Sequence, residues 1–379
     1  MNPISRPPAL GGARRPVIKI GSAVLRDGAD FDRVTFVSLV RGIVALKQQG
    51  LEPVVVCSGA VALGMPLLGI HRRPERIEVL QATAAGQGRL MRMWADELGH
   101  YGLTPAQVLL THDDLRNRRR FLAARQTLRA LLELGAVPII NENDTVAFDE
   151  IKLGDNDLLS SQVVSLVEGQ ILIILSDVAG FYAGDPKAPG AVPERWIEQI
   201  DDRVLALAGG STTGLGSGGM RTKLEAVRQV NQLGVPTIIA PGKQPRILRS
   251  LYAGDALGTW FAADAVPIRR RKHWIAYAPR PAGVITVDAG AERAIRRQGR
   301  SLLPIGITAV DGDFDIGETV SIVGPDGEEF ARGLALHPAD AIRRAAGRRS
   351  SELDTVDLPS PEAVHRDDLV LLRGPESDG

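Results

Sequence analysis

Two neighbouring polar segments concentrate ionisable and amide side chains between apolar runs. They are Asn141-Glu-Asn-Asp-Thr-Val146 and Glu150-Ile-Lys-Leu-Gly-Asp-Asn-Asp157. Residues 136–140 before them are typical of a buried parallel strand, and residues 158–166 after them have the apolar spacing of a helix. Ligands of open α/β sheets bind at the carboxyl ends of strands, and helix N-termini favour anions, so this pattern predicts a ligand site. Helix capping explains one of Asp155, Asn156 and Asp157, but not the whole set.

A glycine-rich segment, Gly214-Leu-Gly-Ser-Gly-Gly-Met-Arg-Thr-Lys223, runs into an amphipathic stretch. Its N–H groups, the positive end of the following helix and the Lys223 ammonium can together hold phosphate charge. The segment lacks the preceding strand and following acidic residue of a dinucleotide fold, and it lacks the Gly-Lys-Ser/Thr of a P-loop. A flexible surface loop is the alternative.

Lys19 interrupts an otherwise apolar strand at residues 17–21. A lysine is seldom buried unless it is paired, so it either faces water on an edge strand or faces an anion such as phosphate. Residues 53–56 predict a second strand, which ends in a small-residue turn where Ser58 and the N–H groups near Gly59 project at the same sheet edge. Ser58 lacks the G-x-S-x-G elbow of a nucleophile, and Cys57 fits a small buried strand residue.

Residues 171–175 form another apolar run that ends in Ser176 and Asp177, which suit either nucleotide contact or a turn. Two lysines, a glycine-rich loop and a carboxylate-amide cluster at strand ends favour phosphoryl transfer. No histidine falls in these segments, which fits an acceptor that is already ionised, such as a carboxylate with a pKa of about 4. We expect Mg²⁺ together with a nucleoside triphosphate, with the metal held mainly by phosphates and water.

Short apolar runs alternate with amphipathic stretches from residue 17 to residue 261, which predicts an α/β fold with a mostly parallel sheet sandwiched by helices. The expected strands are 17–20, 53–56, 106–110, 137–140, 171–175 and 237–240. The expected helices are 31–49, 79–99, 119–134, 158–166 and 220–233.

The pattern changes after residue 261, where a basic stretch and a Pro279-Arg-Pro281 turn signal mark a boundary. We expect a flexible tail at 1–16, the α/β domain at 17–263, a linker at 264–280, a small β-rich domain at 281–373 and a second tail at 374–379. The β-rich domain has strand patterns at 283–288, 317–323 and 369–372 and one clear helix at 338–344.

The composition is that of an ordinary globular protein. The chain has 379 residues, 44% of them hydrophobic, with 45 basic residues balancing 45 acidic residues. This balance gives no global attraction to nucleic acid or to an anionic membrane. The single cysteine fits a reducing compartment, and no apolar run approaches the roughly 18 residues of a membrane span. We therefore expect a cytoplasmic protein that does not associate with membranes.

Six segments make the chain resemble the amino acid kinase family, and within it the kinases that phosphorylate glutamate. They are Val17-Ile-Lys-Ile-Gly-Ser22, Ser58-Gly-Ala60, Phe121-Leu-Ala-Ala-Arg-Gln-Thr-Leu128, Pro138-Ile-Ile-Asn-Glu-Asn-Asp-Thr-Val146, Ile151-Lys-Leu-Gly-Asp-Asn-Asp157 and the glycine-rich segment. The part of the chain from about Pro281, with Ser301-Leu-Leu-Pro304 and Gly317-Glu-Thr-Val320, resembles a PUA domain, a fold that binds RNA in other proteins.

The resemblance implies that ATP phosphorylates the γ-carboxylate of L-glutamate, giving γ-glutamyl phosphate and ADP in the first step of proline synthesis. It implies that Lys19 and Lys223 neutralise the transferring phosphoryl group, that Asp157 orients them, and that the Gly59 N–H lies near the reacting oxygens. The residues it implies for glutamate are Ser58, Asp144 and Asn156. Those it implies for ATP are Lys19, Ser176, Asp177, Ser217, Gly218, Gly219, Met220, Arg221, Thr222 and Lys223. No side chain is assigned as a metal ligand.

The resemblance further implies a homo-oligomer, dimer or tetramer, with feedback inhibition by proline at or beside the glutamate site. Two other hypotheses stay open at this point. The first keeps the fold but changes the acceptor to another carboxylate, a carbamate or a phosphate. The second is an RNA-binding protein with a vestigial kinase domain. The basic patch that could bind RNA, the arginines at 343, 344, 348 and 349, is more typical of a solvated helix face. The neutral charge balance of the chain also gives no support for RNA binding.

Overall fold

The structure is a computed structural model of the chain, and it describes residues 10–28, 30–70, 83–146, 156–186, 188–208, 219–265, 267, 270–277, 281–349 and 360–372. The chain divides into two compact units. Unit 1 comprises Met1–His112 and Ala123–Pro267, and unit 2 comprises Asp113–Leu122 and Ile268–Gly379.

An eight-stranded sheet forms the centre of the described part of unit 1, in the order β5-β6-β4-β1-β7-β9-β10-β8. Its strands are β1 (Pro16–Ile20), β4 (Val54–Cys57), β5 (Pro105–Leu110), β6 (Val137–Glu142), β7 (Ile171–Ser176), β8 (Trp196–Ile197), β9 (Thr237–Pro241) and β10 (Thr259–Phe261). All neighbours run parallel except β9 and β10. A small hairpin, β2 (Arg26–Asp27) with β3 (Asp30–Phe31), stands apart from this sheet.

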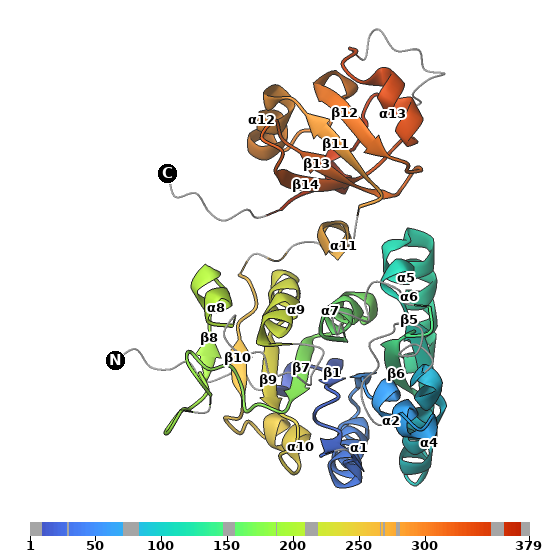
Figure 1. The fold of residues 1–379 in the computed structure, drawn as a ribbon, viewed down its shortest axis with the longest axis vertical. Coiled ribbons are helices and arrows are strands. Elements are labelled where there is room, and N and C mark those ends of the chain that lie inside the picture. The colour runs from blue at the N-terminus through green and yellow to red at the C-terminus, as the bar shows by residue number, and fades with distance from the viewer. Residues whose placement is uncertain are drawn as a thin grey trace. The chain divides into compact units, whose positions relative to one another are not determined.

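Helices cover both faces of the sheet (Figure 1). The helices of unit 1 are α1 (Arg33–Gln48), α2 (Ala60–Leu67), α4 (Gly86–Gly99), α7 (Asn156–Val167), α8 (Asp202–Leu207), α9 (Met220–Gln232), α10 (Ile247–Tyr252) and, from Ala123 onward, α6 (Arg118–Glu133). Helix α5 (His112–Arg116) lies, except for its first residue, in the stretch that belongs to unit 2. Helix α7 packs on β1, β4, β6 and β7 and also contacts α9, which packs on β7 and β9. The opposite face is covered by α1, α4 and α10, whose apolar side chains form one core with the strands. The expected parallel sheet between helices is confirmed.

Unit 2 contains a five-stranded sheet in the order β12-β11-β13-β14-β15. Its strands are β11 (Gly283–Val287), β12 (Ile307–Gly312), β13 (Thr319–Val323), β14 (Glu329–Leu334) and β15 (Leu369–Leu371), and its helices are α11 (Arg270–Tyr277), α12 (Ala289–Gln298) and α13 (Ala339–Ala345). Only β11 and β13 run parallel; the other neighbours are antiparallel. A separate core of buried residues holds these elements together.

The sequence pattern missed α12, so the expectation of one clear helix in the β-rich part is wrong. Its segment is rich in arginine, and among its residues only Ile295 is buried, so it has few large apolar residues to mark a buried face. Its end signals were present. The Asp288 side chain caps the first turn through the Ala291 N–H at 2.7 Å, and Gly299 ends the helix with a φ of 60°.

Helix α11 lies within the segment expected as a linker. The Trp274 indole N–H on this helix donates to the Leu115 carbonyl oxygen at 2.7 Å, and the Trp274 ring packs against Phe121 with centroids 5.9 Å apart. Both partners come from the short stretch 113–122 that unit 2 takes from the middle of the chain. No described helix has the length and apolar character needed to cross a membrane.

Candidate active site

Lys19 lies on β1, in the middle of the sheet between β4 and β7. Side chains alternate between the faces of a strand, so Ile18 and Ile20 enter the core shared with α1, and Lys19 points toward the layer of α7 and α9. Only 6% of Lys19 is exposed. The alternative of an edge-strand lysine facing water is therefore wrong, and a buried ammonium here requires an anion nearby.

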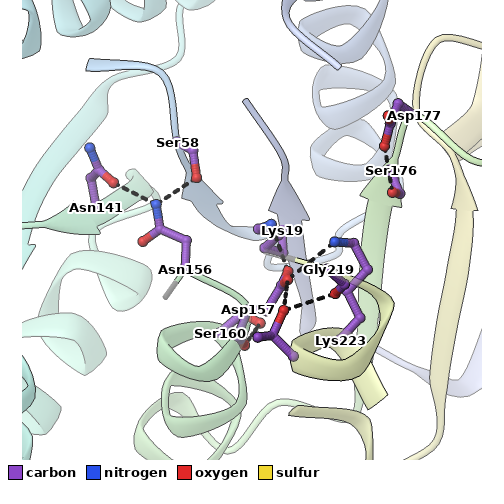
Figure 2. A network of polar contacts seen from close by, with 11 residues as sticks. Lys19, Ser58, Asn141, Asn156, Asp157, Ser160, Ser176, Asp177, Gly219 and Lys223 are labelled. Atoms are coloured by element: carbon purple, nitrogen blue, oxygen red, sulfur yellow. Dashed lines mark hydrogen bonds and ion pairs between the residues drawn. The ribbon is translucent and has the colours of Figure 1, made fainter. Parts of the chain in front are cut away.

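Asp157, in the first turn of α7, supplies that anion. The Asp157 side chain is fully buried, its Oδ1 lies 2.6 Å from Lys19 Nζ, and its Oδ2 lies 3.3 Å from Lys223 Nζ (Figure 2). Lys223 stands in the first turn of α9 and is also buried. Three elements that are distant in the sequence thus bring Lys19, Asp157 and Lys223 together as one group, here called the charge cluster.

The charge cluster stabilises the ionised form of Asp157. Burial raises the pKa of its carboxyl group, but the charges and hydrogen bonds of Lys19 and Lys223 outweigh burial and hold the pKa below its ordinary value. Burial lowers the pKa of the Lys19 ammonium, and Lys223 lowers it further, against the opposing attraction of Asp157. With both ammonium groups protonated, two positive charges face one negative charge. The excess positive charge suits a phosphoryl group.

Hydroxyl groups hold the two helix starts around Asp157. Thr222 Oγ1 donates to the Gly219 carbonyl oxygen at 2.9 Å and lies 3.3 Å from Asp157 Oδ2. Ser160 Oγ donates to the Asp157 carbonyl oxygen at 2.5 Å. Helix α9 begins after Gly219, which has no side chain to cap it, so the first N–H groups of the helix are available to an anion.

A chain of side-chain amides lies beside the charge cluster (Figure 2). Asn156 Nδ2 donates to Ser58 Oγ at 2.6 Å and to Asn141 Oδ1 at 2.9 Å. Asn141 Nδ2 in turn donates to Gln87 Oε1 at 2.8 Å. We call Ser58, Asn156, Asn141 and Gln87 the amide relay. It joins two residues expected to bind substrate, Ser58 and Asn156, to the end of β6 and the start of α4.

Sequence reasoning missed one member of the amide relay. Asn141 was included in the polar segments predicted to form a ligand site, without a role of its own. Gln87 carried no signal, because a glutamine at the start of an amphipathic helix is ordinary.

The turn after β4 brings Ser58 close to β1. The Ser58 N–H donates to the Ile20 carbonyl oxygen at 3.2 Å. Gly59 follows with a φ of 123°, a conformation that side-chain-bearing residues rarely adopt, and it begins α2. Burial raises the pKa of the Cys57 thiol to about 12, which fits the interpretation of Cys57 as an inert strand residue.

The other expected residues lie outside the charge cluster. Asp144, in the turn after β6, is partly exposed, burial raises its pKa to about 6, and no hydrogen bond among described residues joins it to the amide relay. Ser176 Oγ donates to Asp177 Oδ1 at 3.1 Å at the end of β7.

The first turn of α9 holds two more of the residues expected to bind ATP. Met220 begins the helix, and the exposed Arg221 pairs with Glu225 at 3.3 Å. Ser217, Gly218 and Asp155 lie outside the described residues.

Comparison with known proteins places this site in a family. Residues 14–241 match the model of the amino acid kinase family, and residues 283–356 match that of the PUA domain. The chain is 47% identical over 370 residues to the glutamate 5-kinase of Syntrophotalea carbinolica, covering 96% of this chain and 99% of the relative. It is 46% identical over 366 residues to the glutamate 5-kinase of Pseudomonas putida, covering 95% and 98%.

Among solved structures, the carbamate kinase from Giardia lamblia bound to AMP-PNP aligns with a TM-score of 0.48 and 16% identity, covering 66% of this chain and 99% of that one. The sequence relationships decide the assignment. The chain belongs to the amino acid kinase family, and within it to the glutamate 5-kinases.

Proposed function

We propose that this chain transfers the γ-phosphoryl group of ATP to the γ-carboxylate of L-glutamate, giving γ-glutamyl phosphate and ADP. The choice of glutamate follows from relatives named glutamate 5-kinase that align with 95% or more of the chain. The observation that carries the chemistry is the buried charge cluster, because phosphoryl transfer needs positioned positive charge more than covalent catalysis. This reaction would be the first step of proline synthesis.

In this proposal Lys19 and Lys223 face the phosphoryl group as it passes from ATP to glutamate. Asp157 holds both ammonium groups in place from one buried position. The attacking carboxylate, with a pKa of about 4, is already ionised near neutral pH, so the reaction needs no general base. The residues therefore act by orientation and charge, and the Gly59 N–H would lie near the reacting oxygens.

Glutamate would bind at the amide relay. Ser58 and Asn156 offer a hydroxyl and an amide to its polar groups, and the Asp144 carboxylate would meet its ammonium group. The fixed orientation of Asn156 supports this role, since two hydrogen bonds hold its Nδ2 and leave its Oδ1 without a partner among the described residues. A buried oxygen without a partner is a natural acceptor for a ligand N–H.

The phosphates of ATP would lie at the N-terminus of α9, against Gly219, Thr222 and Lys223, with Ser176 and Asp177 as further nucleotide contacts. The described residues contain no group of three ionisable ligands that would form a metal cage. We propose that Mg²⁺ arrives with the nucleotide and keeps phosphate and water ligands. Bound in that way, the metal would neutralise phosphate charge.

Three further properties belong to the proposal. We propose a homo-oligomer, a dimer or a tetramer, that works in the cytoplasm. Proline, the end product, would inhibit at or beside the glutamate site, because it shares the ammonium and α-carboxylate groups of glutamate.

The test is ATP turnover with an acceptor panel in the presence of hydroxylamine, which converts an acyl phosphate into a hydroxamate. The panel contains glutamate, aspartate, N-acetylglutamate and a sample without acceptor. We expect hydroxamate with glutamate alone. Product with aspartate or N-acetylglutamate and none with glutamate would overturn the substrate and keep the chemistry.

A further inference from the structure

A basic cavity lies between α1 and the segment that follows β9, away from the charge cluster. It has a volume of about 660 Å³, within the range of small-molecule sites. Neither Lys19 nor Lys223 lines it. Its basic lining residues are Arg33, Arg41, Lys243, Arg246 and Arg249. We call it the α1–α10 cavity, after the two helices, which contact each other (Figure 1).

No aspartate or glutamate lines the α1–α10 cavity among the residues the structure describes. The nearest acidic groups are already engaged. Glu97 lies 3.5 Å from Arg33, and the Asp32 side chain accepts the Thr35 N–H at the start of α1.

The Lys243 ammonium donates to the Arg26 carbonyl oxygen and interacts electrostatically with the Asp32 carboxylate. Three cations, Arg41, Arg246 and Arg249, therefore remain in the cavity without an ion pair in the described structure. In a chain with no net charge, this is a local concentration of positive charge, and concave walls of one sign focus the field on a ligand.

The backbone holds the two walls of the cavity in fixed positions. Arg246 has a φ of 59°, a left-handed conformation that few non-glycine residues adopt. Its backbone N–H donates a hydrogen bond to Ser38 Oγ of α1 at 3.3 Å. A Cβ on Gly42 would lie 3.1 Å from Leu248, so the glycine lets α10 approach α1 closely. Arg41 and Arg249 are thus presented by two helices in direct contact.

We propose that the α1–α10 cavity binds a small polyanion with two or more phosphate groups, at a site separate from the phosphoryl-transfer site. Guanidinium groups match phosphate oxygens through paired N–H donors, and the three cavity cations without an ion pair in the described structure are all arginines. A ligand with a single negative charge would leave most of this charge unbalanced. The first residue after β9 also links the cavity to the proposed nucleotide site, because the Gly242 N–H donates to the Ser176 carbonyl oxygen at 2.7 Å.

The experiment is calorimetric titration of the full chain with inorganic pyrophosphate, in the presence of saturating ADP so that the nucleotide site is filled. The test variant is Arg41→Gln with Arg249→Gln. The matched control is Arg92→Gln with Arg129→Gln, which removes the same charge from two exposed arginines outside the cavity. If the double variant folds poorly, the single variant Lys243→Gln, at an exposed loop residue, provides the same test.

We expect pyrophosphate to bind the wild-type chain. The Kd for pyrophosphate should rise at least tenfold in the test variant and severalfold in Lys243→Gln, and it should change less than twofold in the control. ADP affinity should be the same in all variants. Absence of pyrophosphate binding to the wild-type chain, or equal binding by the test and control variants, would overturn the proposal. A parallel loss of ADP affinity in the test variant would overturn the separate site, because the cavity would then be part of the nucleotide site.

Discussion

Replacing Asp157 by asparagine keeps the shape of the side chain and removes the negative charge that two buried lysines share. Lys19 Nζ and Lys223 Nζ lie 2.6 Å and 3.3 Å from its carboxylate oxygens. At an effective dielectric constant of about 20, unit charges at these separations attract by about 6 and about 5 kcal/mol before desolvation is subtracted. The substitution leaves both ammonium groups buried without this counter-charge.

The net loss of stability is smaller than these attractions. Lys19, whose pKa burial already lowers, can release its proton when Asp157 no longer carries a charge. Removing one partner of a buried ion pair destabilises proteins by about 3–5 kcal/mol, and we expect Asp157→Asn to lower the free energy of unfolding of unit 1 by this amount at pH 7. Because the folded pKa of Asp157 is lowered, its stabilisation is present above the unfolded pKa and disappears as the pH falls through the folded value.

The assay is hydrogen exchange of peptides that cover β1, which reports the opening of unit 1 without unit 2. The control is Asp96→Asn, the same chemical change at a carboxylate that is 65% exposed and lies 3.9 Å from Arg92. A surface pair of this kind contributes about 0–1 kcal/mol, so the control should change little. If Asp157→Asn were as stable as Asp96→Asn, the charge cluster would not hold unit 1 together as argued.

Three further predictions concern turnover with glutamate. Lys223→Ala should lower kcat by two or more orders of magnitude in a chain that remains folded, because the lysine acts chiefly in the transition state; near-normal kcat would remove that role. Burial raises the pKa of Asp144 to about 6, so its protonation should weaken glutamate binding as the pH falls below that value, and the KM for glutamate should rise by up to about tenfold per pH unit. The Asp144→Asn variant should have a high KM that does not depend on pH in this range. A wild-type KM independent of pH would contradict the contact between Asp144 and the ammonium group of glutamate. Gln87→Ala should raise the KM for glutamate several-fold, because Asn141 would lose its hydrogen bond to Gln87 and would no longer hold Asn156 in place. The KM for ATP should stay unchanged. Equal changes in both KM values would indicate a structural role for Gln87.

The central strands were predictable because their composition decides their structure. β1, β4, β6 and β7 are rich in valine, isoleucine and leucine and are buried on both faces, a pattern that few other structures produce. The two short strands at the β8 end of the sheet were not predictable. β8 spans two residues and β10 three, and such short segments form only because a neighbouring strand offers hydrogen bonds.

The residue types at the site were predictable from local patterns, whereas the pairing of Lys19 and Lys223 with Asp157 was implied only by the resemblance to the family. Lys19 in an apolar strand required an anion, but nothing local in the sequence identifies Asp157, which follows more than a hundred residues later. The pairing arises from the alternation of side chains on β1 and from the packing of α7 across it. The contact of Gln87 with Asn141 likewise depends on where α4 begins, which no local pattern specifies.

The measurement that tests the central claim most directly follows the oxygen atom that attacks ATP. Glutamate labelled with ¹⁸O in its γ-carboxylate is incubated with ATP, Mg²⁺ and the full chain, hydroxylamine releases phosphate from the acyl phosphate, and mass spectrometry determines the isotope in that phosphate. Attack by the carboxylate beside the charge cluster predicts one ¹⁸O in each released phosphate, and no labelled phosphate with Lys223→Ala over the same time. Unlabelled phosphate from the wild-type chain would mean that water, and not glutamate, accepts the phosphoryl group, which would contradict the account.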